Sequence, residues 1–451
     1  MTQAVIQAEP QASLAEWLRQ GPYQAYSYSY PHKSAYRPLP ARSLRDAWAT
    51  EDRSALFAYI HVPFCTMRCG FCNLFAMAQP AEALVESYVD AVVRQMQAMD
   101  RALGERRFVR LAVGGGTPSY LPAALLERLY VAAERILGID LQATPSGIEV
   151  SPETVTPERM RVCREMGVQR VSMGIQSFAQ HEVRALARPQ QNAVVVEAIR
   201  QIREAGFPVM NLDLIYGIDG QTVESWLSSI ESALAFGPEE LYLYPLYVRE
   251  QTGLGKIAIR KAEQGADFRQ ALYAAARARL LAAGYEQVSM RMFRAPHAPR
   301  DSGPVYCCQD DGMVGFGAGA RSYTRSLHYS SSYAVQRSAT RSIIEDFIAC
   351  DEAQFAEARY GFALDGDEQR RRFVIQSLLT DPGLSHAAYE QRFGAPVLED
   401  LPQLQELTAL ELAKDEAGLF QLNARGVSYS DTIGPWLASA AVRGLMPDAP
   451  C

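Results

Sequence analysis

The chain has 451 residues, a net charge of −7 and eight cysteines. This length exceeds the size at which one hydrophobic core stops growing, so we expect two or three domains. The acidic balance excludes a general nucleic-acid-binding surface. The first residues lack the basic start and apolar run of a secretory signal, and no apolar stretch reaches the ~20 residues of a membrane helix. We therefore expect a cytoplasmic protein with no membrane partner, whose cysteines form no disulfide framework.

Residues 1–50 are predicted to form an N-terminal arm. The stretch from Pro22 to Pro40 is rich in tyrosine and proline and shows neither helical nor strand periodicity. Such a composition is typical of a loop packed on a domain surface.

From Ala55 onward, short β-rich runs alternate with longer helical patterns. The predicted strands span residues 55–62, 107–115, 146–151, 168–176, 208–217 and 240–248. The helical patterns between them span residues 83–103, 123–137, 157–167, 192–206 and 223–237. This alternation predicts right-handed βαβ units and a parallel sheet. Six units predict an α/β fold, a partial, open (β/α)6 TIM-like barrel over residues 51–330, with its chemistry at the carboxyl ends of the strands.

After residue 330 the alternation stops, and residues 331–451 are predicted to form a connecting segment and a C-terminal domain. Helical runs cover residues 367–379, 385–394 and 401–412, and a hairpin strand with its turn covers residues 419–426. Three helices and a hairpin indicate a small winged-helix-like domain. Because the region is not basic, a structural cap is favoured over DNA binding.

Three of the cysteines lie within eight residues, in the segment His61-Val-Pro-Phe-Cys65-Thr-Met-Arg-Cys69-Gly-Phe-Cys72. The segment follows the first predicted strand, so it forms a loop at that strand's carboxyl end. Three thiolates can bind three irons of a [4Fe–4S] cluster, leaving the fourth iron open to the amino and carboxylate groups of a small molecule. The alternative is a structural zinc site, which needs four ligands, commonly two Cys-x2-Cys pairs. Because only one such pair is present, with His61 as a candidate fourth ligand, the spacing favours the cluster.

The spacing Cys-x3-Cys-x2-Cys, followed by the Gly-Gly-Gly-Thr-Pro turn at residues 114–118, resembles the radical S-adenosylmethionine (SAM) superfamily. Further matching segments are Ile148–Pro152, Ser172–Phe178, Asp213–Gly217 and Gly315–Gly319. Their order and spacing are similar to the HemN-like branch, which contains oxygen-independent coproporphyrinogen III oxidase and its HemW-type relatives. The resemblance covers residues 50–440, including the C-terminal domain.

The resemblance implies two cofactors: a [4Fe–4S] cluster on the metal ligands Cys65, Cys69 and Cys72, and SAM. Matching positions assign the SAM contacts to Tyr59, which is also the candidate catalytic residue, and to Gly115, Gly116, Glu149, Asp213 and Arg321. Positions that match a second SAM site are Phe71, Gly116, Thr117, Gln176, Arg188 and Asp213. Each has a plainer interpretation, such as a core aromatic, a tight turn, a structural ion pair, an N-cap or a surface charge.

The chain also departs from both well-known subgroups. Leu74 stands where coproporphyrinogen oxidases usually carry a fourth cysteine, and Arg321 stands where the branch has isoleucine. The haem-binding motif His-Asn-x-x-Tyr-Trp of HemW-type chaperones is absent, and the nearest segment is His297-Ala-Pro-Arg300.

Arginines gather in the sequence around two adjacent cysteines, Cys307 and Cys308, which are predicted to be buried thiols because adjacent cysteines bridge only with strain. The arginines are Arg291, Arg294, Arg300, Arg321 and Arg325, and the arm residues His32, Lys33 and Arg37 are candidates to join them. Singly, each is typical of a solvated surface. Together they could clamp the carboxylates of an acidic substrate, for which a tetrapyrrole or another polycarboxylate is a fitting class.

The sequence thus predicts a radical SAM oxidoreductase, similar to coproporphyrinogen dehydrogenase of porphyrin biosynthesis, or a transferase. The alternatives are a C-methyltransferase that uses two SAM molecules and a non-catalytic haem carrier. The expected partners are a small-molecule substrate and an electron donor such as flavodoxin or ferredoxin, and the expected state is a monomer.

Overall fold

The computed structural model describes residues 12–27, 29–248, 252–255, 267–299 and 311–446. It divides into two compact units. Unit 1 comprises Met1–Tyr36, Gln287–Met290 and Leu364–Cys451, and unit 2 comprises Arg37–Glu286 and Arg291–Ala363. The domain boundaries expected at residues 50 and 330 stay predictions.

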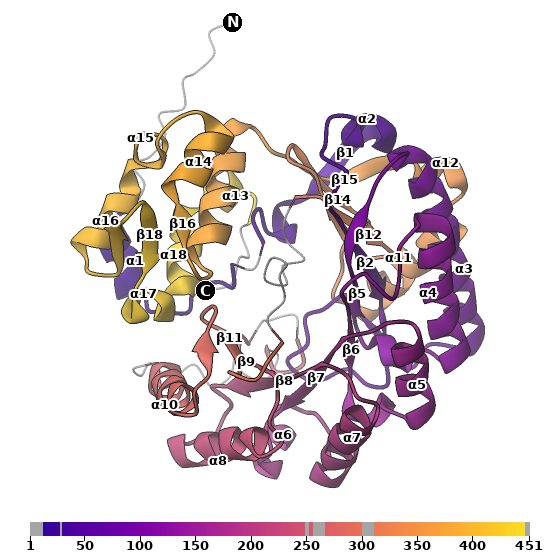
Figure 1. The fold of residues 1–451 in the computed structure, drawn as a ribbon, viewed down its shortest axis with the longest axis horizontal. Helices are drawn as coiled ribbons and strands as arrows, with labels where there is room; N and C mark the ends of the chain where they lie inside the picture. Colours follow the sequence, from indigo (N-terminus) through magenta and orange to yellow (C-terminus); the bar gives the residue numbers. More distant parts are fainter. Residues whose placement is uncertain (1–11, 28, 249–251, 256–266, 300–310, 447–451) are drawn as a thin grey trace, which may run out of the picture. The chain divides into compact units, whose positions relative to one another are not determined.

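Unit 2 is built on a sheet whose central strands are parallel (Figure 1). In spatial order these strands are β12 (Met313–Phe316), β2 (Leu56–Val62), β5 (Phe108–Gly115), β6 (Ser146–Val150), β7 (Arg170–Gln176), β8 (Val209–Tyr216) and β9 (Glu240–Pro245). All six strands of the predicted parallel sheet are therefore present. The seventh, β12, pairs in parallel with β2 and lies outside the βαβ pattern that the sequence displays.

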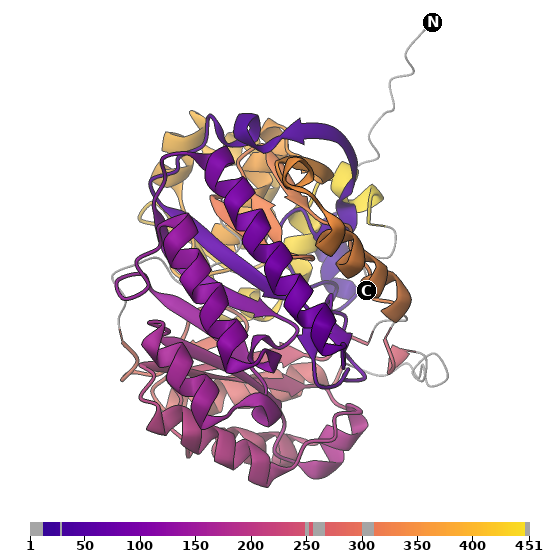
Figure 2. The ribbon, with the colours of Figure 1, turned by 90° about the vertical axis from the view of Figure 1, so that its right-hand side faces the viewer.

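Helices cover the outer face of the sheet, which Figure 2 views from the side of α3 and α4. These helices are α3 (Glu82–Leu103), α4 (Ala123–Leu137), α5 (Pro157–Glu165), α6 (Gln180–Ala185), α7 (Asn192–Glu204), α8 (Val223–Leu234) and α10 (Arg269–Ala282). In α3 the buried side chains Val85, Val89, Val92, Met96 and Met99 recur every three or four residues. This spacing is the apolar stripe by which a helix packs on a sheet.

Short antiparallel strands extend the sheet at both ends. They are β13 (Arg321–Tyr323), β14 (Leu327–Ser330), β15 (Glu357–Ala363) and β1 (Arg37–Ser43) beyond β12, and β11 (Met292–Arg294) and β10 (Glu286–Gln287) beyond β9. Within the described residues the strand order runs from β1 to β10 without closing, so the partial, open barrel expected from the sequence is confirmed. The expectation of a loop up to Pro40 was wrong from Arg37 onward, because β1 pairs only with β15 and an edge strand tolerates prolines.

Three further helices of unit 2 are α2 (Leu44–Trp48), α11 (Arg337–Ala349) and α12 (Glu352–Phe355). Single-turn 3-10 helices follow β5 at Pro118–Tyr120 and β6 at Pro152–Thr154. No helix in the described part of the chain is both long and apolar enough to cross a membrane.

Unit 1 contains the predicted C-terminal helices and hairpin. Its helices are α1 (Leu14–Arg19), α13 (Gly366–Leu378), α14 (His386–Phe393), α15 (Val397–Asp400), α16 (Gln405–Ala409), α17 (Ala424–Ser428), α18 (Ser430–Leu437) and α19 (Ala440–Gly444), with 3-10 turns at Lys33–Ala35 and Pro402–Leu404. Its strands β16 (Leu384–Ser385), β18 (Leu419–Leu422) and β17 (Ala413–Glu416) form a small sheet in that order. The buried carboxylate of Glu368 accepts hydrogen bonds from Tyr30 and, at 2.6 Å, from Ser439 Oγ. These bonds tie the tyrosine-rich N-terminal stretch to the C-terminal helices.

Candidate functional site

The predicted site residues lie at the carboxyl edge of the parallel sheet in unit 2. Strand pairing sets Tyr59 of β2 beside Ala112 of β5 and Val62 beside Gly115. Further along, Glu149 of β6 is paired with Ser172 of β7, and Gly174 of β7 with Asp213 of β8. Because parallel strands end at the same edge, side chains far apart in the sequence meet there.

The cysteine loop leaves β2 at this edge and is fixed by backbone hydrogen bonds. Cys65 lies in β3 (Phe64–Cys65), which pairs in parallel with β4 (Met77–Ala78). Gly70 N–H donates to Leu186 O at 3.0 Å, and Leu254 N–H donates to Gly70 O at 2.9 Å. The loop therefore has a defined conformation at both its first and its middle cysteine.

The glycine turn at the end of β5 brings backbone against four side chains of the site. A Cβ atom on Gly114 would lie 3.0 Å from Tyr59 Oη and 3.1 Å from Glu149 Oε1. On Gly115, which has a φ of +119°, it would lie 2.7 Å from the His61 ring. On Gly116 it would lie 2.9 Å from Cys65 Sγ. No larger residue fits at these positions without displacing a neighbour, which explains the glycine run physically.

Two polar side chains donate to the cysteine sulfurs. Thr117 Oγ1 lies 3.5 Å from Cys65 Sγ, and Arg188 Nη1 lies 3.4 Å from Cys69 Sγ. Burial raises the pKa of the Cys65 thiol to about 12; the Thr117 hydrogen bond lowers this pKa, and the charges of Cys72 and Cys69 raise it. Cys65 therefore interacts electrostatically with both other cysteines of the loop.

The cysteine loop fits a cluster better than a single metal ion. Its three cysteines are half-buried and form no disulfide among the described residues. Within the described ranges, no three His, Cys, Asp or Glu side chains converge as ligands of one ion. A cluster in which each thiolate binds a different iron requires no such convergence, and donors aimed at two of the sulfurs suit negatively charged thiolates.

Tyr59, His61 and Glu149 surround the glycine turn. Tyr59 Oη lies 3.2 Å from Nδ1 of His61, and Nε2 of the same ring lies 3.1 Å from Phe75 O. Gly115 N–H donates to Glu149 Oε2 at 2.9 Å. Glu149 is the exposed residue of β6, but desolvation by the surrounding fold disfavours its charged form and raises the pKa of its carboxylate to about 7. The Gly115 hydrogen bond opposes that rise, and the charge of Asp213 adds to it.

Asp213 lies inside β8 rather than at a helix N-cap. Asn211 Nδ2 donates to its Oδ1 at 2.7 Å. Burial raises the pKa of Asp213 to about 6, while the Asn211 hydrogen bond and the charge of Arg170 lower it. Arg170 itself is paired with Glu240, with Nε 2.8 Å from Oε2. A carboxylate held in this way is available to a cationic or hydroxyl-bearing ligand.

The remaining positions matched to a second SAM site gather beside the cysteine loop. Gln176 is buried at the end of β7 with a φ of +72°, a left-handed conformation that is costly for a residue with a side chain and is typically found at functional sites. Arg188 Nη2 donates at 2.9 Å to the carbonyl oxygen of Gly174, which lies two residues before Gln176. Phe71 packs against the buried cluster that includes Leu186 and Ile215.

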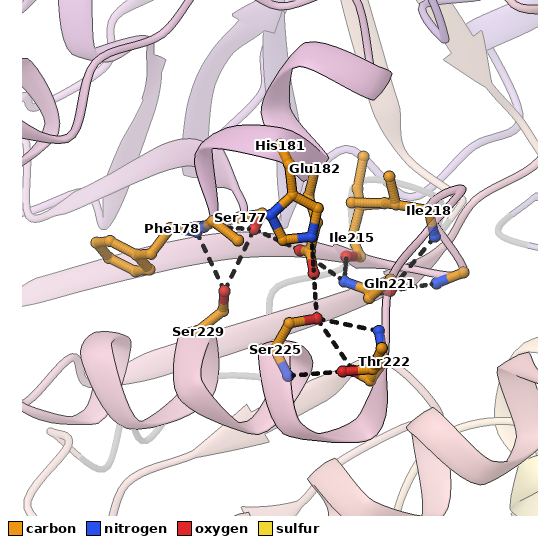
Figure 3. A network of polar contacts seen from close by, with 12 residues as sticks. Ser177, Phe178, His181, Glu182, Ile215, Ile218, Gln221, Thr222, Ser225 and Ser229 are labelled. Atoms are coloured by element: carbon orange, nitrogen blue, oxygen red, sulfur yellow. Dashed lines mark hydrogen bonds and ion pairs between the residues drawn. The ribbon is translucent and has the colours of Figure 1, made fainter.

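A buried carboxylate that the sequence analysis missed fixes the helix leading to Arg188 (Figure 3). Glu182 in α6 is fully buried and accepts hydrogen bonds from Ser177 Oγ at 2.6 Å, Gln221 Nε2 at 2.9 Å and Ser225 Oγ at 2.5 Å. Ser229 joins this network through a hydrogen bond of 3.2 Å between its Oγ and that of Ser177. The network joins the segments that follow β7 and β8 to α6 and α8. Nothing in the sequence distinguishes Glu182 from an exposed helix carboxylate, because two of these three donors, Gln221 and Ser225, lie 39 and 43 residues away.

Among the described residues, the arginines that gather in the sequence lie in different places along the sheet. Arg321 begins β13 at the carboxyl edge, with its guanidinium 5.9 Å from the Tyr323 ring. Arg325 lies in the turn at the other end of β13, 3.5 Å from Glu51. Arg294 lies 3.7 Å from Glu240. Arg321 and Arg325 lie at opposite ends of β13, so the expected joint clamp was wrong for Arg325.

The other residues expected to act in this region also lie in different places. Arg291 is buried next to β11, and Leu74 is exposed. Arg300, Cys307 and Cys308 lie outside the described residues. His32 and Lys33 belong to unit 1, whereas Arg37 begins β1 in unit 2.

Comparison with known proteins gives matches to two families and to several relatives. Residues 59–233 match the radical SAM superfamily, and residues 364–429 match the HemN C-terminal domain. The chain is 26% identical over 430 residues to the oxygen-independent coproporphyrinogen III oxidase of Salmonella typhimurium, covering 90% of each chain. It is 30% identical over 277 residues to the heme chaperone HemW of Synechocystis, covering 59% of this chain and 65% of that protein.

A solved structure extends these matches to the fold. The coproporphyrinogen III oxidase HemN of Escherichia coli superposes with a TM-score of 0.76 and 23% identity, over 92% of this chain and 97% of that chain. The cofactors expected from the sequence, a [4Fe–4S] cluster and SAM, are those of the radical SAM superfamily.

Substitution of Gly116 tests the contact between the glycine turn and the cysteine loop. In Gly116→Ala the new methyl group would sit 2.9 Å from Cys65 Sγ and 2.8 Å from Phe64 O, so the loop must shift. We expect the variant to bind less than about half the iron of the wild type after anaerobic reconstitution, because overpacking displaces a ligand. Gly147→Ala in β6 is the matched control, since its methyl group meets nothing closer than 3.5 Å. Equal iron in Gly116→Ala and wild type would contradict this geometry.

The raised pKa of Glu149 predicts a pH dependence of stability. Because the folded-state pKa of about 7 lies above the ordinary value of 4.5, ionisation of Glu149 opposes folding. Its contribution is most favourable below pH ~4.5 and is lost as the pH rises toward about 7. In Glu149→Gln, thermal unfolding without ligand should therefore lose less stability between pH 5 and pH 8 than in the wild type. Glu158→Gln, an exposed position in α5, should keep the wild-type profile, and an unchanged profile in Glu149→Gln would refute the prediction.

Proposed function

Because the chain contains a radical SAM domain followed by a HemN-type C-terminal domain, we propose that it is an enzyme that cleaves SAM reductively and acts on a small organic substrate. The observation that supports this most directly is the cysteine loop at the carboxyl edge of the sheet. There, Thr117 and Arg188 donate to two of its sulfurs, and Tyr59, Gly115 and Glu149 lie beside it.

The three cysteines are proposed to hold the cluster. Cys65, Cys69 and Cys72 would supply one thiolate to each of three irons, so that one iron keeps no protein ligand. When bound, the cluster supplies the electron that cleaves SAM into methionine and a 5′-deoxyadenosyl radical. Gly116 leaves the space that Cys65 occupies, and Thr117 orients its sulfur.

The residues around the glycine turn are proposed to bind SAM. SAM carries a sulfonium cation and an amino group. A carboxylate attracts the cation and accepts hydrogen bonds from the N–H groups of the amino end. Glu149 reaches the ionised state more easily when a cation binds next to it, because an adjacent positive charge lowers a carboxylate pKa. The Gly115 backbone donates to this carboxylate, and Tyr59 Oη and the carboxylate both border Gly114, so these groups would fix the orientation of the amino end. Asp213 in β8 would accept further hydrogen bonds from SAM.

The proposed substrate class is a tetrapyrrole or another polycarboxylate. The coproporphyrinogen III oxidase relatives, matched over 90% of their length, support this class and an oxidative reaction. Arg321 at the start of β13 is a candidate carboxylate contact in unit 2. The proposal is limited by Leu74, which replaces the expected fourth cysteine, so the reaction need not be the one named for those relatives.

Two alternatives remain as outcomes of the test. Arg188 has five N–H donors and uses three within the described residues, which leaves two for the carboxylate of a second SAM in a methyltransferase. The strained backbone of Gln176 next to it supports the same alternative. The match to HemW supports a haem carrier instead.

The decisive experiment measures SAM cleavage by anaerobically reconstituted protein. With dithionite and methyl-labelled SAM, the wild type should release 5′-deoxyadenosine without added substrate. The triple variant Cys65→Ala, Cys69→Ala and Cys72→Ala should release none, because no thiolate remains for the irons. Cys350→Ala, a half-buried cysteine of unit 2 outside the loop, should behave as the wild type.

The outcomes separate the alternatives. Transfer of the methyl label to a product would favour the methyltransferase. A Soret band after haem addition, with no deoxyadenosine, would contradict the enzyme and favour the carrier. Cleavage that persists in the triple cysteine variant would contradict the assignment of the cluster ligands.

A further inference from the structure

Arg188 is a buried cation whose contacts end on a cysteine sulfur. Its side chain has an exposed fraction of 8%. Nε donates to Gln190 Oε1 at 2.9 Å, Nη2 donates to Gly174 O at 2.9 Å, and Nη1 donates to Cys69 Sγ at 3.4 Å. Across the described ranges no carboxylate lies within ion-pair distance of this guanidinium.

The guanidinium is held in place from several sides. Gln190, which accepts from Nε, itself donates to Ile175 O in β7 at 2.9 Å. The preceding residue, Ala187, has a φ of +48° and so turns the chain sharply after α6. Glu182 anchors α6 through three buried hydrogen bonds. Two residues before Arg188, the carbonyl of Leu186 accepts from Gly70 in the cysteine loop. The position of Arg188 relative to Cys69 is therefore set by the fold rather than by the arginine itself.

A buried guanidinium without a carboxylate partner is costly, and a neutral thiol compensates little of that cost. A thiolate does compensate it, because it is an anion and a good acceptor. A [4Fe–4S] core held by three thiolates carries a net negative charge, and one-electron reduction makes that charge larger. A fixed cation next to it stabilises the reduced form more than the oxidised form. Hydrogen bonds to the sulfurs act in the same direction.

We propose that Arg188 acts through Cys69, as a positioning residue, on the transfer of an electron to the cluster. Its hydrogen bond to Cys69 raises the reduction potential of a cluster held by the three cysteines. The proposal rests on the proposed function, since it requires that cluster. It is separate from a role in binding a second SAM, which would depend on the two N–H groups for which the described residues supply no acceptor. Thr117, which donates to Cys65, is a second and uncharged donor of the same kind.

The test is a redox titration without SAM and without substrate, so that ligand binding does not enter. Wild type, Arg188→Met, Arg188→Lys and Arg184→Met are reconstituted anaerobically, and iron content and cluster absorbance are measured first. Arg184 is an exposed residue of α6, the helix that precedes Arg188, so Arg184→Met removes a neighbouring arginine without touching the cysteine loop. The reduced cluster is then followed by EPR against the applied potential.

Arg188→Met should be about tenfold harder to reduce than the wild type, a shift of about 59 mV to more negative potential for a one-electron couple. Arg188→Lys keeps the cation but loses the planar guanidinium, so its reduction potential should lie between those of the wild type and Arg188→Met. Arg184→Met should match the wild type. If Arg188→Met does not fold with a full cluster, the change in reduction potential of Arg188→Lys decides the test instead. Full clusters with unchanged potentials in the Arg188 variants would overturn the proposal, and a wild type that binds no iron would overturn the proposed function as well.

Discussion

The site depends on the close approach of the Gly114–Gly116 turn to the strand and loop beside it. This turn is the place where β5 ends next to β2, and the parallel register sets His61 beside Gly114 and Val62 beside Gly115. With no side chains of its own, the turn admits Tyr59 and Glu149 on one side and Cys65 on the other. The cysteine loop and the proposed SAM contacts therefore share a single piece of backbone. A shift of this turn would change both together.

Buried polar groups supply the rest of the rigidity. Glu182 joins the ends of β7 and β8 to the following helices, far from the cysteines, and reaches them only through α6, Leu186 and Arg188. The Glu182 carboxylate is satisfied by donors from the segments that follow β7 and β8, and a buried polar network that is satisfied in this way fixes one arrangement. The strained backbone at Gln176 and Ala187 lies in the same region. Such strain persists only where the surrounding structure overdetermines it, as it does around Arg188.

The sequence predicts the repetitive part of this fold well and the unique contacts poorly. The six parallel strands β2, β5, β6, β7, β8 and β9 follow from the alternation of β-rich and helical runs, because each βαβ unit repeats the same local pattern. The antiparallel strands β13 and β14 are too short for such a pattern, and β15 lies outside the βαβ repeat. β1 contains Pro38 and Pro40, which are tolerated because this strand lies at an edge.

The same distinction between local patterns and tertiary contacts holds for the candidate site. The cysteine spacing and the glycine run are local signals and can be read from the chain. The role of Glu182, the contact between Arg188 and Cys69 and the separation of Arg321 from Arg325 depend on tertiary pairing, which no local pattern encodes.

The central claim is that the three cysteines leave one iron open and that SAM binds to it. Electron–nuclear double resonance on the reduced protein, with SAM labelled with ¹⁵N at the amino group and ¹⁷O at the carboxylate, tests this most directly. The account predicts hyperfine coupling of both labels to the cluster spin, weakened in Glu149→Gln because the carboxylate that faces the Gly115 backbone is lost. A reduced cluster whose spectrum shows no coupling to either label at saturating SAM would contradict it.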